Sequence, residues 1–132
     1  MTRYRRDTNT VSHLVRGSPA LDRRVTEVPI AALCISAVTE GELLFGLARR
    51  PGAVRLRATV MELVKRVDTL AWDSAAAERY GELRAELERL GRPLGPLDTM
   101  IAAHALAADA VLISNDRAFA QAPGLRVEDW TT

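Results

Sequence analysis

The chain of 132 residues carries a net charge of +1, with 48% hydrophobic and 27% charged residues, which is the composition of one globular domain. No apolar run approaches the roughly 20 residues of a membrane-spanning helix, and the basic N-terminus lacks the apolar core of a signal peptide. Because Cys34 is alone, an internal disulfide and a cysteine-based zinc cluster are excluded. We expect a single domain over residues 1–132 and a cytoplasmic location.

The first part of the chain alternates short strands with helices. A first strand is predicted to end near Arg6, and the polar cluster 7–10 then begins a helix, since such side chains accept the free N–H groups of a first turn. A second helix over 21–28 stops at Pro29. The apolar run 30–36 predicts a buried strand.

The middle of the chain predicts three helices and one strand. Residues 36–39 open a helix that is closed by 49–52, and an amphipathic helix spans 54–67. A short strand is expected over 69–72. Asp73 or Ser74 then caps a helix that runs to Leu90, and Gly91 ends it.

The stretch 96–119 combines a helix that is apolar on nearly every side with a short strand, 111–113. A helix that is apolar on nearly every side is expected to be buried against a sheet. A Val-Leu-Ile run is typical of a central parallel strand. One acid stands at each end of this unit, Asp98 in the first helical turn and Asp116 just past the strand. The alternation of strands and helices predicts an α/β fold, a three-layer α/β/α sandwich on a mainly parallel sheet of four to five strands.

Four acids follow the predicted strands or open the helices beside them. In an open parallel sheet, ligands bind outside the carboxyl ends of the strands, and Asp7, Glu42, Asp98 and Asp116 are all expected at that edge. Their mutual repulsion requires bound cations. Oxygen ligands without His or Cys select Mg²⁺ or Mn²⁺, and two such ions can activate water for phosphodiester hydrolysis.

Each acid alone has a simpler explanation. Asp7 and Asp116 could cap helices, and Asp98 is placed where the helix dipole favours an acid. Spacing does not choose between Glu40 and Glu42, because each lines up with apolar residues of its own helix. The joint arrangement of the four acids is what favours a metal site.

Charge is distributed unevenly along the chain. Residues 1–66 contain twelve Lys or Arg against six acids, whereas 67–132 contain six Arg against eleven acids. Arginine forks suit phosphate groups, so the N-terminal half could hold a nucleic-acid backbone. Solvated surfaces and genome composition explain an arginine-rich chain equally well.

Several segments together resemble one known family. They are Asp7-Thr8-Asn9, 36–46 (SAVTEGELLFG), 96–103 (PLDTMIAA) and 112–119 (LISNDRAF), followed by Pro123-Gly124-Leu125 and Trp130. The pattern resembles the PIN-domain ribonucleases and, within them, the VapC toxins of bacterial toxin–antitoxin (VapBC) pairs, over essentially the whole chain.

The resemblance implies a single PIN domain with Mg²⁺- or Mn²⁺-dependent endonuclease activity on RNA, often structured RNA such as tRNA. It also implies a VapB-like antitoxin partner and a homodimer. In the family the acid precedes Leu and stands four residues before Gly, which selects Glu42. Asp7, Asp98 and Asp116 match the other acidic positions, and Thr8, Asn9 and Ser114 match positions that orient the carboxylates.

One feature departs from the family. Arg5 and Arg6 stand where the first strand is usually apolar, and buried arginines need partners or an edge position. The competing function is a catalytically inactive PIN-like module that binds nucleic acid or protein. A phosphoacceptor domain is disfavoured because the only lysine, Lys65, lies within the predicted helix 54–67.

Two residues that could carry other chemistry are assigned to the core. His104 lies on the apolar helix and is expected to be packed and hydrogen-bonded rather than a base. Cys34 lies inside an apolar strand and is expected to be a small core residue.

Overall fold

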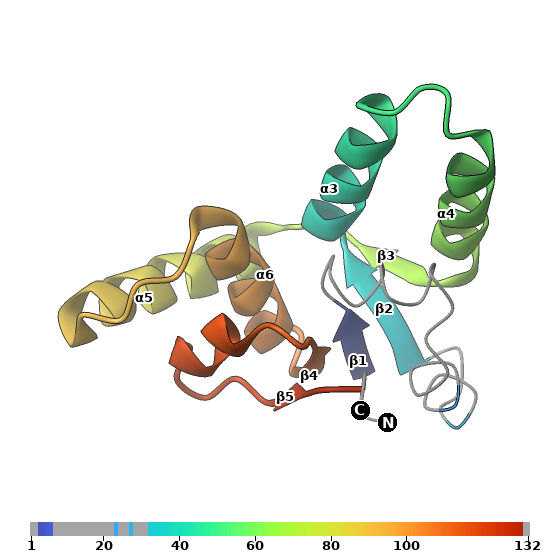
Figure 1. Cartoon of the computed structure of the whole chain (residues 1–132). Coiled ribbons are helices and arrows are strands. Elements are labelled where there is room, and N and C mark those ends of the chain that lie inside the picture. The colour runs from blue at the N-terminus through green and yellow to red at the C-terminus, as the bar shows by residue number, and fades with distance from the viewer. Residues whose placement is uncertain (1–2, 7–22, 24–26, 28–31, 131–132) are drawn as a thin grey trace.

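The computed structural model describes residues 3–6, 23, 27 and 32–130 (Figure 1). Two helices were predicted within residues 7–28, and most of these residues lie outside the described part of the chain. Asp7, Thr8 and Asn9 lie outside it as well. Within the described part, no helix is long and apolar enough to cross a membrane.

The described elements alternate as the sequence predicts. They are β1 (Arg3–Arg6), β2 (Leu33–Ser36), α3 (Ala37–Ala48), α4 (Val54–Arg66), β3 (Asp68–Leu70), α5 (Ser74–Leu90), α6 (Pro96–Ala107), β4 (Ala110–Ile113), the 3₁₀ helix η2 (Arg117–Gln121) and β5 (Val127–Glu128). Helix α5 has the predicted ends, because Asp73 Oδ1 accepts a hydrogen bond from the Ala76 N–H and Gly91 adopts φ 64°.

The strands form one five-stranded sheet in the order β3-β2-β1-β4-β5, and every neighbouring pair is parallel. This confirms the predicted parallel α/β sheet. Strand β1 is central, so Arg5 and Arg6 belong to the middle of the sheet and not to an edge. In β1, Arg6 is in register with Ile35 on one side and Ile113 on the other.

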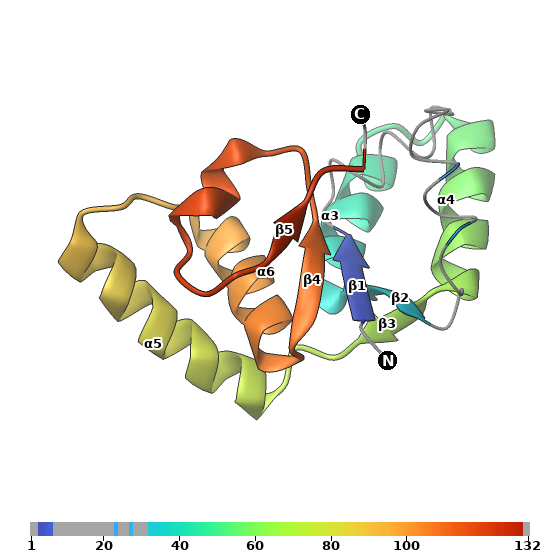
Figure 2. The ribbon, with the colours of Figure 1, turned by 90° about the horizontal axis from the view of Figure 1, so that it is seen from below.

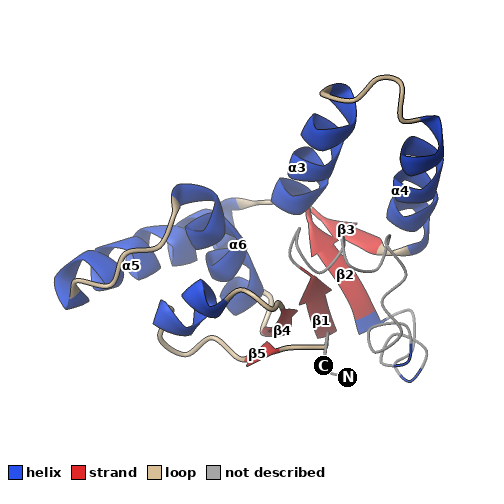
Figure 3. Ribbon diagram, in the orientation of Figure 1, coloured by secondary structure: helices blue, strands red, loops and turns tan. Residues whose placement is uncertain are grey.

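Helices cover both faces of the sheet, as Figure 3 shows for the pair α3 and α4 and the pair α5 and α6. Successive side chains of a strand point to opposite faces. Val111 and Ile113 accordingly join one apolar cluster with side chains of α3 and α4, whereas Leu112 joins a second cluster with side chains of α5 and α6. The three-layer prediction is therefore confirmed, with a separate core on each face.

The amphipathic helix α4 turns its predicted apolar stripe toward the sheet. Val60 is buried in the first cluster, and Leu56, Leu63 and Val64 pack against it half-buried. Cys34 is buried as predicted.

The third strand differs from its prediction. It spans Asp68–Leu70 instead of 69–72. The indole Nε1 of Trp72 donates a hydrogen bond to the Met100 carbonyl of α6 at 3.1 Å. This contact directs the chain out of the sheet before α5 begins, and it joins residues 28 positions apart, which a local pattern does not reveal.

A buried hydrogen bond ties helix α6 to the end of β2. Ser36 Oγ and His104 Nδ1 are 2.8 Å apart, and both side chains are buried. The same Oγ accepts a hydrogen bond from the Val38 N–H and so caps α3. His104 is thus packed and hydrogen-bonded, as predicted. One hydroxyl therefore fixes the start of α3 and the position of α6.

We predict that Ser36→Ala lowers the free energy of unfolding by about 2–4 kcal/mol, since it removes a helix cap and one partner of a buried imidazole. Urea denaturation measures this change. Ser74→Ala is the matched control, because Ser74 is exposed and the cap of α5 is Asp73; its effect should stay within about 0.5 kcal/mol. Equal losses in the two variants would contradict the role given to Ser36.

Candidate functional site

Three strands end at one edge of the sheet. Because β1, β2 and β4 are parallel and Arg6 is level with Ile35 and Ile113, their carboxyl ends meet there. In an open parallel sheet this edge is where ligands bind.

Glu42 lies on α3, the helix that starts directly after β2. Its side chain is half-buried, as is that of Glu40, so exposure does not separate the two. The buried face of α3 contains Thr39, Leu43 and Leu47. Thr39 Oγ1 has no hydrogen-bond partner among the described residues, although it is fully buried. Thr39 stands one helical turn before Glu42 on α3. The unsatisfied hydroxyl oxygen of Thr39 is therefore one turn away from this acid.

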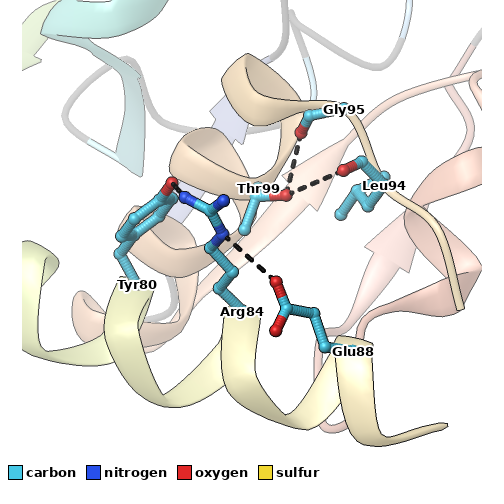
Figure 4. A network of polar contacts seen from close by, with 6 residues as sticks. All are labelled: Tyr80, Arg84, Glu88, Leu94, Gly95 and Thr99. Atoms are coloured by element: carbon cyan, nitrogen blue, oxygen red, sulfur yellow. Dashed lines mark hydrogen bonds and ion pairs between the residues drawn. The ribbon is translucent and has the colours of Figure 1, made fainter. Parts of the chain in front are cut away.

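Asp98 lies in the first turn of α6 and is half-buried. Figure 2 shows α6 running alongside β4 in the opposite direction, so its first turn lies toward the carboxyl edge of the sheet. Helix α6 is anchored there by Thr99, whose hydroxyl donates to the carbonyls of Gly95 at 2.8 Å and Leu94 at 3.3 Å (Figure 4). The N-cap residue, Gly95, offers no side chain to the free N–H groups, and Asp98 is the acid of that turn.

Asp116 follows β4 and caps the 3₁₀ helix η2. Its Oδ1 accepts a hydrogen bond from the Ala118 N–H at 2.9 Å, and its backbone N–H donates to Ser114 Oγ at 3.0 Å. The capping interpretation is therefore confirmed for this residue. Ser114 is buried and holds the backbone of Asp116. A carboxylate has about four acceptor positions, so a capping Asp retains the capacity to bind a cation.

The described acids do not form a complete ligand group. Within residues 3–6, 23, 27 and 32–130, no three His, Cys, Asp or Glu side chains are grouped so that they could hold a metal ion. Asp7, the fourth predicted acid, lies outside the described residues together with Thr8 and Asn9. In their chemistry, Glu42, Asp98 and Asp116 offer only carboxylate oxygens, which fit Mg²⁺ or Mn²⁺ rather than zinc.

A pocket of about 520 Å³ lies where α5, the loop after it and the start of α6 meet. Its lining residues are Tyr80, Arg84, Leu87, Glu88, Gly91, Arg92, Pro93, Leu94, Pro96 and Thr99. This pocket was not predicted, because the clusters of arginine in the sequence lie in its N-terminal half. The spacing of Tyr80, Arg84 and Leu87, which places them on one face of a helix, was the available signal.

Ser36 and Thr39 were also missed as site residues. A serine directly before a helix is a capping signal, but its bond to His104 spans 68 positions of sequence. The unsatisfied hydroxyl of Thr39 has no signal in the sequence, because it depends on how α3 packs.

Comparison with known proteins places the chain in a family. The PIN domain family matches residues 6–125. The tRNA(fMet)-specific endonuclease VapC of Shigella flexneri is 39% identical over 99% of this chain and 100% of its own length.

Solved structures agree with this match. The fold is similar to a chain in the crystal structure of DNA-bound VapBC from Salmonella typhimurium, with a TM-score of 0.91, 37% identity and coverage of 98% of this chain and 99% of that one. A chain of VapBC-1 from nontypeable Haemophilus influenzae gives a TM-score of 0.88 at 29% identity, covering 99% of this chain and 100% of that one. The chain described here therefore belongs to the PIN domain family and, within it, to the VapC proteins.

Proposed function

We propose that this protein is a metal-dependent endoribonuclease and the toxin of a VapBC-type toxin–antitoxin pair. The observation that carries the proposal is the full-length identity of 39% to a relative named as a tRNA-specific endonuclease. A second observation supports it. Segments that start at the carboxyl edge of the sheet, or point to it, carry Glu42, Asp98 and Asp116.

Asp7, Glu42, Asp98 and Asp116 would hold one or two Mg²⁺ or Mn²⁺ ions. Asp7 is included because it directly follows Arg6, the last residue of the central strand β1, in the sequence. The bound metal would supply a polarised water and would stabilise negative charge on the leaving oxygen of a phosphodiester. Thr8, Asn9 and Ser114 would orient the carboxylates.

The described residues set the geometry of this site. Ser36 fixes the start of α3 and hence the helix that carries Glu42, and its bond to His104 fixes α6, which carries Asp98. The Ser114 hydroxyl holds the turn that bears Asp116. These fixed supports keep the carboxylates in place without reorganisation when RNA binds, which is a requirement of electrostatic catalysis.

The substrate we propose is structured RNA such as tRNA, in keeping with the name of the Shigella relative. The partner we propose is a VapB-like antitoxin, because the similar structures are VapBC complexes. A homodimer is part of the same proposal. The competing function, an inactive PIN-like binding module, lacks support from the sequence, because none of the four acids is missing.

Asp98→Asn should lower the rate of RNA cleavage by at least about 100-fold, because an amide lacks the charge that holds a divalent cation. Cleavage of labelled tRNA in Mg²⁺, with circular dichroism to verify the fold, measures this loss. Asp109→Asn is the control, since Asp109 is exposed and forms an exposed ion pair with Arg126; it should cleave at the wild-type rate. Full activity of Asp98→Asn would exclude Asp98 from the site.

Removal of divalent metal should stop cleavage without unfolding the protein. We expect no product in excess EDTA and recovery of the original rate when Mg²⁺ or Mn²⁺ is restored in excess. The time course of tRNA cleavage, measured on one preparation through both steps, tests this. Cleavage that continues at the same rate in EDTA would rule out the metal mechanism.

A further inference from the structure

Arg84 lies on the wall of the pocket between α5 and α6 and contacts two side chains of its own helix. Its Nη1 donates a hydrogen bond to the Tyr80 hydroxyl at 3.0 Å, and its Nε lies 3.7 Å from Glu88 Oε1 (Figure 4). The hydrogen bond to Tyr80 raises the pKa of Arg84, and an arginine guanidinium is in any case charged at physiological pH. The side chain nevertheless remains 62% exposed and can receive a ligand.

Tyr80 is itself anchored to the opposite helix. Its ring meets Trp72 edge to face, with centroids 5.9 Å apart, and Trp72 donates a hydrogen bond to the Met100 carbonyl of α6. These contacts connect Arg84 on α5 to the backbone of α6. The contact with Tyr80 restricts the Arg84 side chain, which lowers the side-chain entropy that binding a partner would cost.

A second cation lines the same pocket. Arg92 follows the left-handed Gly91, and its N–H donates to the Leu87 carbonyl at 3.0 Å, which fixes the loop backbone where α5 ends. The pocket volume of about 520 Å³ lies within the range of about 300–1,000 Å³ that is typical of small-molecule sites. Its cations are Arg84 and Arg92, and Glu88 is the acid among its lining residues.

The pocket lies beside the first turn of α6. Pro96 and Thr99 line it, and Asp98 belongs to the same turn but lies on another face of the helix and does not line the pocket. By contrast, Arg49 and Arg50 follow the far end of α3, a helix of 12 residues that spans about 18 Å from the carboxyl edge. Arg49 and Arg50 are therefore separated from that edge by the length of α3.

We infer that this pocket binds a phosphate group of the RNA backbone through Arg84 and Arg92, and that it positions the strand beside Asp98. The inference rests on the proposed ribonuclease function and assigns substrate binding to residues outside the acid group. A guanidinium can donate two parallel hydrogen bonds to phosphate oxygens. Glu88 does not prevent this, because an exposed ion pair contributes little to stability and a phosphate can replace it.

The test is RNA binding by the full-length chain, measured in EDTA so that the RNA stays intact. Fluorescence anisotropy with labelled tRNA, over a series of KCl concentrations, gives both Kd and its salt dependence. Arg84→Gln and Arg92→Gln should each raise Kd about tenfold and reduce the slope of log K against log [salt] by about 0.7–0.9, the value for one lost phosphate contact. In steady-state cleavage, KM should rise while kcat stays the same.

Arg89→Gln is the matched control. Arg89 lies on the same helix, is exposed, pairs with Glu86 and does not line the pocket. It should leave Kd and the salt slope at the wild-type values. Arg84→Lys, which keeps the charge but loses the fork geometry, should retain most of the salt slope while it weakens binding.

Three outcomes would decide against the inference. If Arg84→Gln and Arg92→Gln bind RNA as Arg89→Gln does, the pocket does not contact the backbone. If they leave RNA binding unchanged but weaken self-association in sedimentation, the pocket belongs to a protein interface. If both bind RNA more weakly with an unchanged salt slope, no phosphate contact has been lost. All three leave the ribonuclease function intact as long as the wild-type chain cleaves RNA in Mg²⁺, whereas its failure to do so overturns that function instead.

Discussion

The parallel register of β1 between β2 and β4 is the constraint on which the rest of the structure depends. It sets Arg6 level with Ile35 and Ile113, so three strands end together. Among the described residues, the segments that follow β2 and β4 carry Glu42 and Asp116, and α6 returns toward β4 with Asp98 in its first turn. A shift of one residue would turn every side chain of β1 to the opposite face.

The supports beneath this edge are polar and buried. A single hydroxyl, that of Ser36, caps α3 and bonds His104, while Ser114 holds the turn at Asp116. Buried polar groups of this kind are costly unless they are satisfied, and once satisfied they define one arrangement. In the proposed function, two tasks are thereby separate: buried hydroxyls and an imidazole fix the backbone, and half-buried carboxylates bind the metal.

Local signals predicted the elements whose ends are determined locally. Asp73 and Gly91 mark the ends of α5 in the sequence as they do in the structure. The end of β3 was mispredicted, because the Trp72 contact with Met100 is made between distant segments. The choice of Glu42 over Glu40 came from the family pattern, since the helical period did not separate them and their burial is alike.

The position of Arg5 and Arg6 in the sheet could not be predicted from the sequence for a different reason. Their charge required either partners or an edge position, and β1 proves to be central, since Tyr4, Arg5 and Arg6 are paired with β2 and all four of its residues with β4. The pocket of Arg84 and Arg92 was missed for a related reason. A count of charges along the sequence favours the N-terminal half as the place of a phosphate-binding site. The pocket forms where α5 and α6 meet, and that depends on the fold.

The central claim is that carboxylates at the carboxyl edge of the sheet bind a divalent cation. The most direct measurement is a calorimetric titration of the metal-free protein with Mn²⁺, in parallel with Glu42→Gln. The account predicts saturable binding by the wild-type chain and affinity at least about tenfold weaker in the variant. An absence of saturable binding in the wild-type chain, or equal affinity in the two proteins, would contradict it.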